Sequence, residues 1–365
     1  MGDAAPEDAS RVQEVLDRLR RAADPSGFVP FDRFMDVALY ADRVGLYALR
    51  RSPLGPKGDF YTAAHVSPLF AATIAERVRA ARRELPASEP FRIVELGPGD
   101  GTLAEGLVAN LAAEPGLTEY VLIDRSSARA TEAEGRVRAV AHGIHVRRSV
   151  SLGQDGPFAG AVIANEFLDA QPARRLRWDG RAWKELGVEI AAGRLRAAER
   201  DVERSVPSPP LPTPSEEGAI LEVSPGAEGA VREIGDHLLA GLAILIDYGV
   251  EETELLRGHP SGTLAAVRHH RTVEDPLVDP GTADLSTFVN FSRIRRVARD
   301  SGLREVAFRS QAEALGAWGF PRLLEGALAA AGSAEAQVRL RLAAKNLLFG
   351  FERFRVLELA PRAVT

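Results

Sequence analysis

The chain has 365 residues, with 51 acidic and 46 basic side chains and a formal net charge of −5. This balance gives no bulk attraction for nucleic acid, so we expect no nucleic-acid partner. The lack of cysteine excludes disulfides, thiolate metal sites and cysteine nucleophiles. Residues 1–10 are acidic and small, unlike a signal peptide, and the longest apolar run, 238–246, is much shorter than a membrane span. We therefore expect a cytoplasmic protein with no membrane partner.

Apolar residues at helical spacing predict two helices near the N-terminus, over residues 12–19 and 31–39. We assign residues 1–60 to an N-terminal helical segment. Ser67 is a favoured N-cap residue and Pro68 suits the first helical position, so a third helix is expected to begin there.

Residues 91–102 have the pattern of a strand, a tight glycine turn and the start of a helix. Glu95 stands near the end of the apolar run, and glycines follow at Gly97, Gly99 and Gly101. A dinucleotide fingerprint, G-x-G-x-x-G, needs its third glycine later, whereas E-x-G-x-G is the pattern of S-adenosylmethionine (SAM) methyltransferases. An ordinary strand-to-helix loop is the alternative.

Apolar runs separated at first by helical segments predict a parallel sheet in a Rossmann-like α/β fold. The runs lie at residues 92–96, 120–123, 144–146, 160–164 and 242–246. We expect residues 61–173 to form the first part of the cofactor-binding domain and residues 216–365 the remainder.

Residues 174–215 are expected to form a β-rich insertion after the fourth strand. Asp179-Gly180 between two apolar-alternating runs is a hairpin signal. The paired runs are residues 174–178 with 181–186, and residues 188–190 with 194–196. Residues 206–214 are proline-rich and predict an exposed linker.

The C-terminal part is expected to alternate helices and strands. Helices are predicted at residues 226–241, 291–302 and within 313–348, and strands at 263–267, 304–309 and 354–359.

Polar side chains follow the second and fourth predicted strands, at the edge where ligands of open α/β sheets bind. Asp124 ends the second strand and could accept both ribose hydroxyls of a nucleoside, the alternative being a surface acid. Asn165, Glu166 and Asp169 follow the fourth strand, where an acceptor would meet the cofactor. A carboxylate there suits a guanidinium or an amine, and a helix cap is the alternative.

Residues 58–68 form a further candidate segment that could close over the cofactor, with a loop leading to a capped helix as the alternative. Its candidate contacts are Tyr61, Thr62, His65 and Ser67.

Two other stretches carry polar groups that suit a site. His269 and His270 are adjacent and lack spaced partners, so we expect no metal site and keep His270 as a candidate base or hydrogen-bond partner. Residues 280–285 are either a binding loop or a helix N-terminus capped around Asp284.

These segments, taken together and in order, resemble the MidA family of SAM-dependent methyltransferases, bacterial relatives of a mitochondrial complex I assembly factor. The matching strings are residues 31–40, 58–63, 67–70, 95–103, 164–172, 246–249, 262–264, 280–285, 288–291 and 354–357.

The resemblance implies a class I methyltransferase sheet, SAM as the cofactor and an arginine guanidino nitrogen as the methyl acceptor. Carried over by position, it places Glu95, Gly97 and Gly99 on the methionine side of SAM, Asp124 at the ribose and Glu166 toward the acceptor.

The chain also departs from the family pattern. The family usually has Pro-Glu where Ala64-His65 stands, Val-Glu where Ile123-Asp124 stands, and a basic residue where Asp100 stands. The acceptor therefore stays open between protein arginine and free arginine or another small guanidine. O- or carboxyl-methylation of a small metabolite and a non-catalytic SAM-binding assembly factor are the other hypotheses, and a homodimer is one alternative for the oligomeric state.

Overall fold

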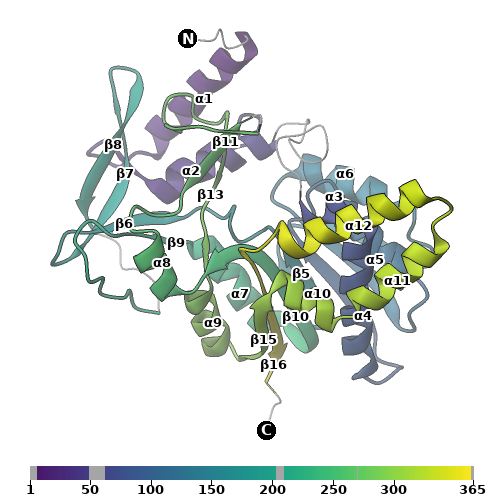
Figure 1. Ribbon diagram of the computed structural model, residues 1–365. Helices are drawn as coiled ribbons and strands as arrows, with labels where there is room; N and C mark the ends of the chain where they lie inside the picture. Colours follow the sequence, from purple (N-terminus) through teal and green to yellow (C-terminus); the bar gives the residue numbers. More distant parts are fainter. Residues whose placement is uncertain (1–5, 49–61, 203–208, 269, 363–365) are drawn as a thin grey trace. The chain divides into compact units, whose positions relative to one another are not determined.

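The computed structural model of the protein describes residues 6–48, 62–202, 209–268 and 270–362 (Figure 1). The chain forms two compact units, each assembled from separated stretches of sequence. Unit 1 comprises Met1–Arg51, Leu168–Ala230 and Val250–Val297, and unit 2 comprises Ser52–Phe167, Val231–Gly249 and Ala298–Thr365.

Unit 2 is built on a mostly parallel sheet with the strand order β15-β16-β10-β5-β2-β3-β4 (Figure 1). The parallel strands are β2 (Phe91–Leu96), β3 (Leu117–Ile123), β4 (His145–Ser149), β5 (Phe158–Asn165) and β10 (Leu238–Val250). Strand β16 (Phe354–Pro361) runs antiparallel to both neighbours, β10 and β15 (Leu303–Ser310). The α/β class and the parallel sheet predicted from the sequence are confirmed.

Helices pack on this sheet and on one another, and their buried apolar residues join those of the strands in one core. They are α3 (Ala63–Val66), α4 (Pro68–Arg83), α5 (Thr102–Leu111), α6 (Ser127–Arg138), α10 (Gln311–Ala317), α11 (Phe320–Ala330) and α12 (Ala334–Phe349). Helices α4 and α5 approach closely at Gly106, where a Cβ would lie 2.5 Å from that of Ala71. The predicted start of α4 is confirmed, since the Ser67 hydroxyl accepts a hydrogen bond from the Leu69 N–H at 3.2 Å.

The boundary between α7 (Pro225–His237) and β10 corrects the sequence prediction, which continued the helix to residue 241. Residues from Leu238 onward pair instead with β5. The strands approach so closely at Gly241 that a Cβ there would lie 1.9 Å from the Gly160 carbonyl oxygen. Only glycine, with its φ of 111°, fits this position.

Unit 1 contains an antiparallel sheet with the strand order β1-β7-β6-β9, in which β8 also pairs with β7. Its strands are β1 (Phe28–Pro30), β6 (Arg174–Trp178), β7 (Trp183–Ala191), β8 (Arg194–Asp201) and β9 (Ile220–Val223). Helices α1 (Pro6–Ala22) and α2 (Phe31–Tyr40) and the short helix η1 (Leu46–Ala48) belong to the same unit.

Both predicted hairpins are present in unit 1. The second strand of the first hairpin begins at Trp183 rather than residue 181, because the Asp179 carboxylate holds the turn by accepting from the N–H groups of Arg181 and Ala182. The second hairpin is longer than predicted, and its turn, Ala192-Gly193, has positive φ at both residues.

The remaining elements of this region are α8 (Glu252–Gly258), β11 (Ala265–Arg268), β12 (Arg271–Thr272), β13 (Asp284–Ser286), β14 (Val289–Asn290) and α9 (Phe291–Asp300). Asp284 begins a strand, so the predicted alternative of a helix N-cap there is wrong. Strand β13 pairs with β11, and the Asp284 carboxylate accepts a hydrogen bond from the Tyr47 hydroxyl.

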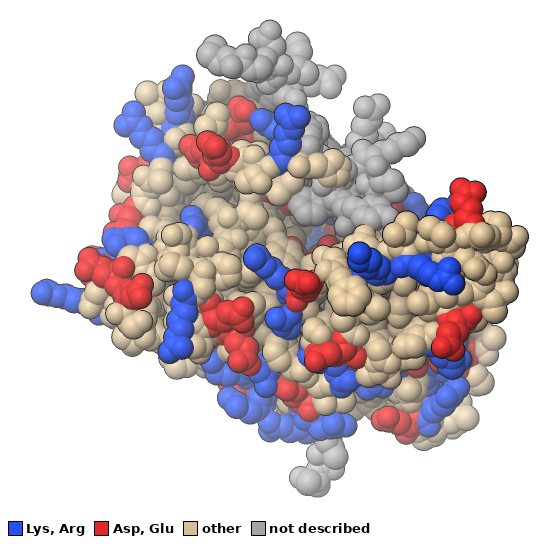
Figure 2. All heavy atoms as spheres, in the orientation of Figure 1, with Lys and Arg blue, Asp and Glu red and all other residues tan. Residues whose placement is uncertain are grey.

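Acidic and basic side chains are interspersed on the face of the molecule shown in Figure 2. Of the helices in the described part of the chain, none combines the length and the apolar character that a membrane span requires.

Candidate cofactor site

The glycine turn between β2 and α5 requires glycine for conformation and for space. Gly97, Gly99 and Gly101 have φ angles of 69°, 57° and 83°. A Cβ on Gly97 would lie 2.7 Å from the Phe167 ring, and one on Gly101 would lie 2.7 Å from the Cα of Ala133. Because these glycines carry no side chains of their own, a ligand can approach the backbone of the turn.

Glu95 lies beneath this turn, at the end of β2, and is 2% exposed. Its carboxylate accepts a hydrogen bond from the Tyr120 hydroxyl at 2.7 Å. Burial raises the pKa of Glu95 to about 7, the Tyr120 hydrogen bond lowers it, and the negative charge of Asp100 adds to the rise. Sequence reasoning missed Tyr120, although the alternation of the two strands places it on the same face as Glu95.

Asp100 is bonded within the turn and to the segment before α4. Its carboxylate accepts from the N–H and hydroxyl of Thr102, each at 3.0 Å, and lies 3.2 Å from Nε2 of His65. Burial raises the pKa of Asp100, but the hydrogen bonds from His65 and Thr102 outweigh it and lower the pKa to about 2. Two positions at which the chain departs from the family pattern, 65 and 100, therefore lie in contact.

Asp124 follows β3 at the same edge of the sheet. Its Oδ1 accepts from the Ser126 N–H at 2.7 Å, and Ser126 in turn caps α6. Burial raises the pKa of Asp124, with the Ser126 N–H and the nearby Arg129 acting in the opposite sense. The hydrogen bond from Ser126, at the start of α6, fixes the direction of the Asp124 side chain at the end of β3.

Asn165 is the last residue of β5, and Glu166 begins the strand-end loop that follows it. Glu166 has a φ of 52°, the left-handed region that a non-glycine residue enters only under constraint. Its N–H donates to the Ile246 carbonyl at 2.9 Å, and its carboxylate lies 3.3 Å from Nδ2 of Asn165 and 3.4 Å from the N–H of Ala63. The loop therefore holds a carboxylate at the carboxyl end of the sheet.

Two groups around this loop stand out: Asp247, which sequence reasoning did not single out as a site residue, and the predicted site residue Asn165. The fully buried Asp247 accepts from the N–H of Phe167 at 3.1 Å and of Tyr248 at 2.9 Å, which ties the loop to β10. Asp247 directly follows an apolar run, and that polar residue at a strand end was the available signal. Oδ1 of Asn165 is buried and accepts no hydrogen bond from the residues that the structure describes.

The other predicted site residues are divided between the two units or lie outside the described residues. Thr62 lies 2.9 Å, Oγ1 to Nδ1, from His65, whereas Tyr61 and His269 lie outside the described residues. Asp169 and the exposed turn residue His270 belong to unit 1, while Asn165 and Glu166 belong to unit 2. No cluster of residues that could hold a metal occurs in the described ranges.

The chemistry of this edge of unit 2 fits SAM. The glycine turn suits a ligand that packs on backbone, and Glu95 and Asp124 supply acceptors for ammonium and hydroxyl groups. The buried oxygen of Asn165 offers a further acceptor for a donor of the ligand. Gly97, Gly99, Glu95, Asp124 and Asn165 are thus the residues that would hold the cofactor.

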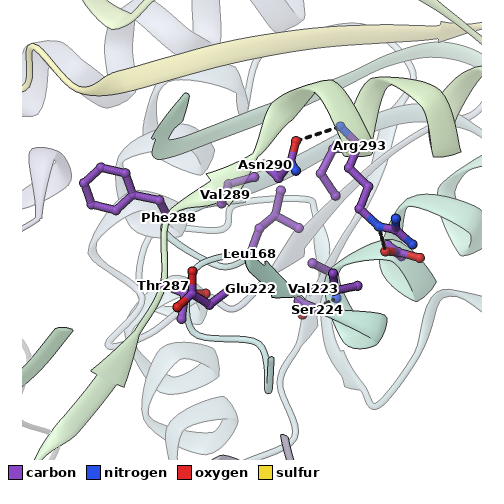
Figure 3. A pocket seen from close by; sticks show the side chains of 12 residues that line it. Leu168, Glu222, Val223, Ser224, Thr287, Phe288, Val289, Asn290 and Arg293 are labelled. Carbon is purple, nitrogen blue, oxygen red and sulfur yellow. Dashed lines mark hydrogen bonds and ion pairs between the residues drawn. The ribbon is translucent and has the colours of Figure 1, made fainter. Parts of the chain in front are cut away.

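A separate pocket lies within unit 1 (Figure 3). Its polar wall includes Glu228 and Arg293, which form a buried ion pair, and Arg293 also donates to the Pro209 carbonyl at 2.6 Å. The cavity measures about 20 Å³, room for about one water molecule. It is too small for a nucleoside, so we do not assign the cofactor to it.

Comparisons with known proteins identify the family and the cofactor. Residues 69–308 match a family described as S-adenosyl-L-methionine-dependent methyltransferases. A COG1565 superfamily protein of Burkholderia thailandensis, solved bound to S-adenosyl-homocysteine (SAH), is 31% identical, with a TM-score of 0.89 over 100% of this chain and 96% of that one.

Curated relatives are more distant. The mitochondrial protein arginine methyltransferase NDUFAF7 homolog of Drosophila melanogaster is 27% identical over 329 residues, covering 81% of this chain and 74% of that protein. The human NDUFAF7 protein is 25% identical over 319 residues, covering 79% of this chain and 69% of its own length. With the family match, the similar fold and the SAH-bound structure, this chain belongs to the SAM-dependent methyltransferases of the MidA-like family, and its cofactor is SAM.

Proposed function

We propose that the protein methylates a guanidino nitrogen of arginine, either in a protein or in free arginine or another small guanidine. The observation that carries the proposal is the carboxylate of Glu166, held in a left-handed backbone conformation at the carboxyl end of β5. The curated relatives support it, because they are named protein arginine methyltransferases.

Bound SAM would supply a methyl group on a sulfonium, and the acceptor nitrogen would form the new N–C bond as the S–C bond breaks, leaving SAH. The role of the chain is to hold the acceptor in line, since positioning supplies much of the rate in such transfers. Glu166 would pair with the guanidinium, keep the positive charge on the other nitrogens, and accept the proton that the attacking nitrogen releases.

The direct test uses methyl-labelled SAM with free arginine, with arginine-containing peptides and with cell lysate, followed by mass spectrometry of the products. The proposal predicts label on arginine. Label on a carboxylate or hydroxyl of a small metabolite would replace arginine as the acceptor, and a protein that binds SAM but labels nothing would support the assembly-factor hypothesis.

The Glu166→Gln variant tests the assigned role. We expect turnover to fall by about 100-fold or more, because an amide neither pairs with the cation nor takes its proton. SAH affinity should stay within about threefold of the parent. Glu325→Gln, an exposed residue of α11, is the control. Full turnover in Glu166→Gln would exclude this role for Glu166.

A further inference from the structure

The imidazole of His65 connects a short helical segment to the cofactor turn. His65 lies in α3, the single-turn helix that begins after Thr62. Its Nδ1 lies 2.9 Å from the Thr62 hydroxyl and its Nε2 lies 3.2 Å from Oδ2 of Asp100. The two side chains are only 8% and 13% exposed, so both ring nitrogens are committed to these contacts.

The chemistry of Asp100 sets the direction of its hydrogen bond with His65. The pKa of Asp100 is lowered to about 2, so near neutral pH its carboxylate only accepts, and Nε2 of His65 carries the donated proton. Its Nδ1 faces the Thr62 hydroxyl, so the imidazole is held at two points.

Asp100 links His65 to the glycine turn and to the start of α5. The same carboxylate accepts from the Thr102 N–H and hydroxyl at the start of α5, and Arg136 lies 3.4 Å away. Asp100 stands between Gly99 and Gly101, whose backbone has few conformational restraints of its own. A side-chain contact at this point limits which turn conformations are occupied.

The other end of α3 reaches the strand-end loop. The Ala63 N–H lies 3.4 Å from Oε1 of Glu166. The residue 62–66 segment therefore contacts the glycine turn, through His65 and Asp100, and the strand-end loop, through Glu166. We propose that His65 is a positioning residue for SAM binding: by donating from Nε2 to Asp100 it holds the Gly97–Gly101 turn and the residue 62–66 segment in the arrangement that the cofactor requires.

The proposal concerns the cofactor and not the acceptor, so binding of SAH tests it without any assumption about arginine. Titration calorimetry with SAH measures the Kd of full-length variants. We expect His65→Ala to weaken SAH binding about tenfold, which corresponds to about 1.4 kcal/mol. Asp100→Ala should weaken binding at least as much, because it also removes the contacts with Thr102 and Arg136. Adding His65→Ala to Asp100→Ala should weaken binding by much less than it does in the parent, because the His65–Asp100 contact is already lost.

Two amide substitutions separate the ring nitrogens. Glutamine places its amide nitrogen near the position of Nε2, whereas asparagine reaches only the position of Nδ1. His65→Gln should therefore bind SAH within about threefold of the parent, and His65→Asn should resemble His65→Ala. His145→Ala is the matched control, since His145 is 70% exposed and its ring lies 3.5 Å from Glu119.

Thermal melting of the same variants separates positioning from packing. The proposal predicts that His65→Gln and His65→Asn melt at similar temperatures but differ in SAH affinity. An unchanged SAH Kd in His65→Ala, or equal SAH affinity in the glutamine and asparagine variants, would overturn it. The amide pair keeps the test decisive if the alanine variant does not fold.

Discussion

Burial of Glu95 links the cofactor turn to the stability of the fold. The carboxyl group is surrounded by apolar strand residues, and its partner is the Tyr120 hydroxyl. Its pKa of about 7, against an ordinary value of 4.5, means that the folded state keeps a proton that the unfolded state releases between these pH values. Raising the pH through this window therefore lowers the free energy of unfolding.

We predict that Glu95→Gln stabilises the protein at about pH 8, by on the order of 2–3 kcal/mol, and has little effect at about pH 4. The neutral amide removes the cost of burying a charge and still accepts from Tyr120. Urea unfolding at both pH values measures the difference.

Glu119→Gln is a control for which we expect a change in stability of the opposite sign. Burial raises the pKa of Glu119, but Arg147 and Arg92 outweigh it and lower the pKa, so this substitution should destabilise the protein at about pH 8. If Glu95→Gln also destabilises at that pH, the buried carboxyl group is more favourable in its charged form than we infer.

Ser67 shows how much of an element can be predicted from local sequence. A serine before a proline indicated the start of α4, and in the structure the Ser67 hydroxyl accepts a hydrogen bond from the Leu69 N–H. Ser67 is also predicted to contact the cofactor. That prediction is separate, because the Ser67 hydroxyl already accepts the hydrogen bond from the Leu69 N–H at the start of α4.

We predict that Ser67→Ala lowers the free energy of unfolding by about 1 kcal/mol through loss of the cap, and that Ser67→Gly costs less than Ser67→Ala. Denaturant unfolding measures the effect. Ser333→Ala, which removes the corresponding cap of α12, should cost a similar amount. Comparing SAH affinity in the two alanine variants tests the cofactor role, because a contact with SAM would weaken binding only in Ser67→Ala.

Two other predictions of secondary structure were wrong because strands pair with partners far away in the sequence. Residues 238–241 follow a helical pattern along the chain, yet they extend β10 because β5 is available beside them. Asp284 resembled a helix cap, but pairing of β13 with β11 makes it a strand residue. In both places a tertiary partner outweighs local propensity.

At the scale of the whole molecule, each unit is assembled from segments far apart in the chain. A ligand that binds the folded state stabilises it by mass action, by about 2.7 kcal/mol when present at 100 times its Kd. Because the candidate cofactor residues Glu95, Gly97, Gly99, Asp124 and Asn165 all belong to unit 2, the strongest local effects of SAH should fall there.

We predict that saturating SAH slows amide hydrogen exchange most at residues 97–101, 124–126 and 165–167, with little change in β8 of unit 1. Exchange measured by mass spectrometry with and without SAH checks this, with adenosine at equal concentration as the control. Protection confined to peptides outside unit 2 would contradict the assigned cofactor site.

The sequence alone determined the features that depend on local pattern: the alternation of apolar runs and helices, the glycine turn after Glu95, and hence the α/β class. The SAM cofactor followed from the resemblance of its motifs to a methyltransferase family. Only the tertiary structure decided which side chains meet. Tyr120 reaches Glu95, Asp100 reaches His65, and Asp247 reaches Phe167 across 25, 35 and 80 residues of chain. The physical reason is that backbone periodicity is encoded within a few residues, whereas these contacts depend on strand order, register and the path of loops that the pattern does not specify.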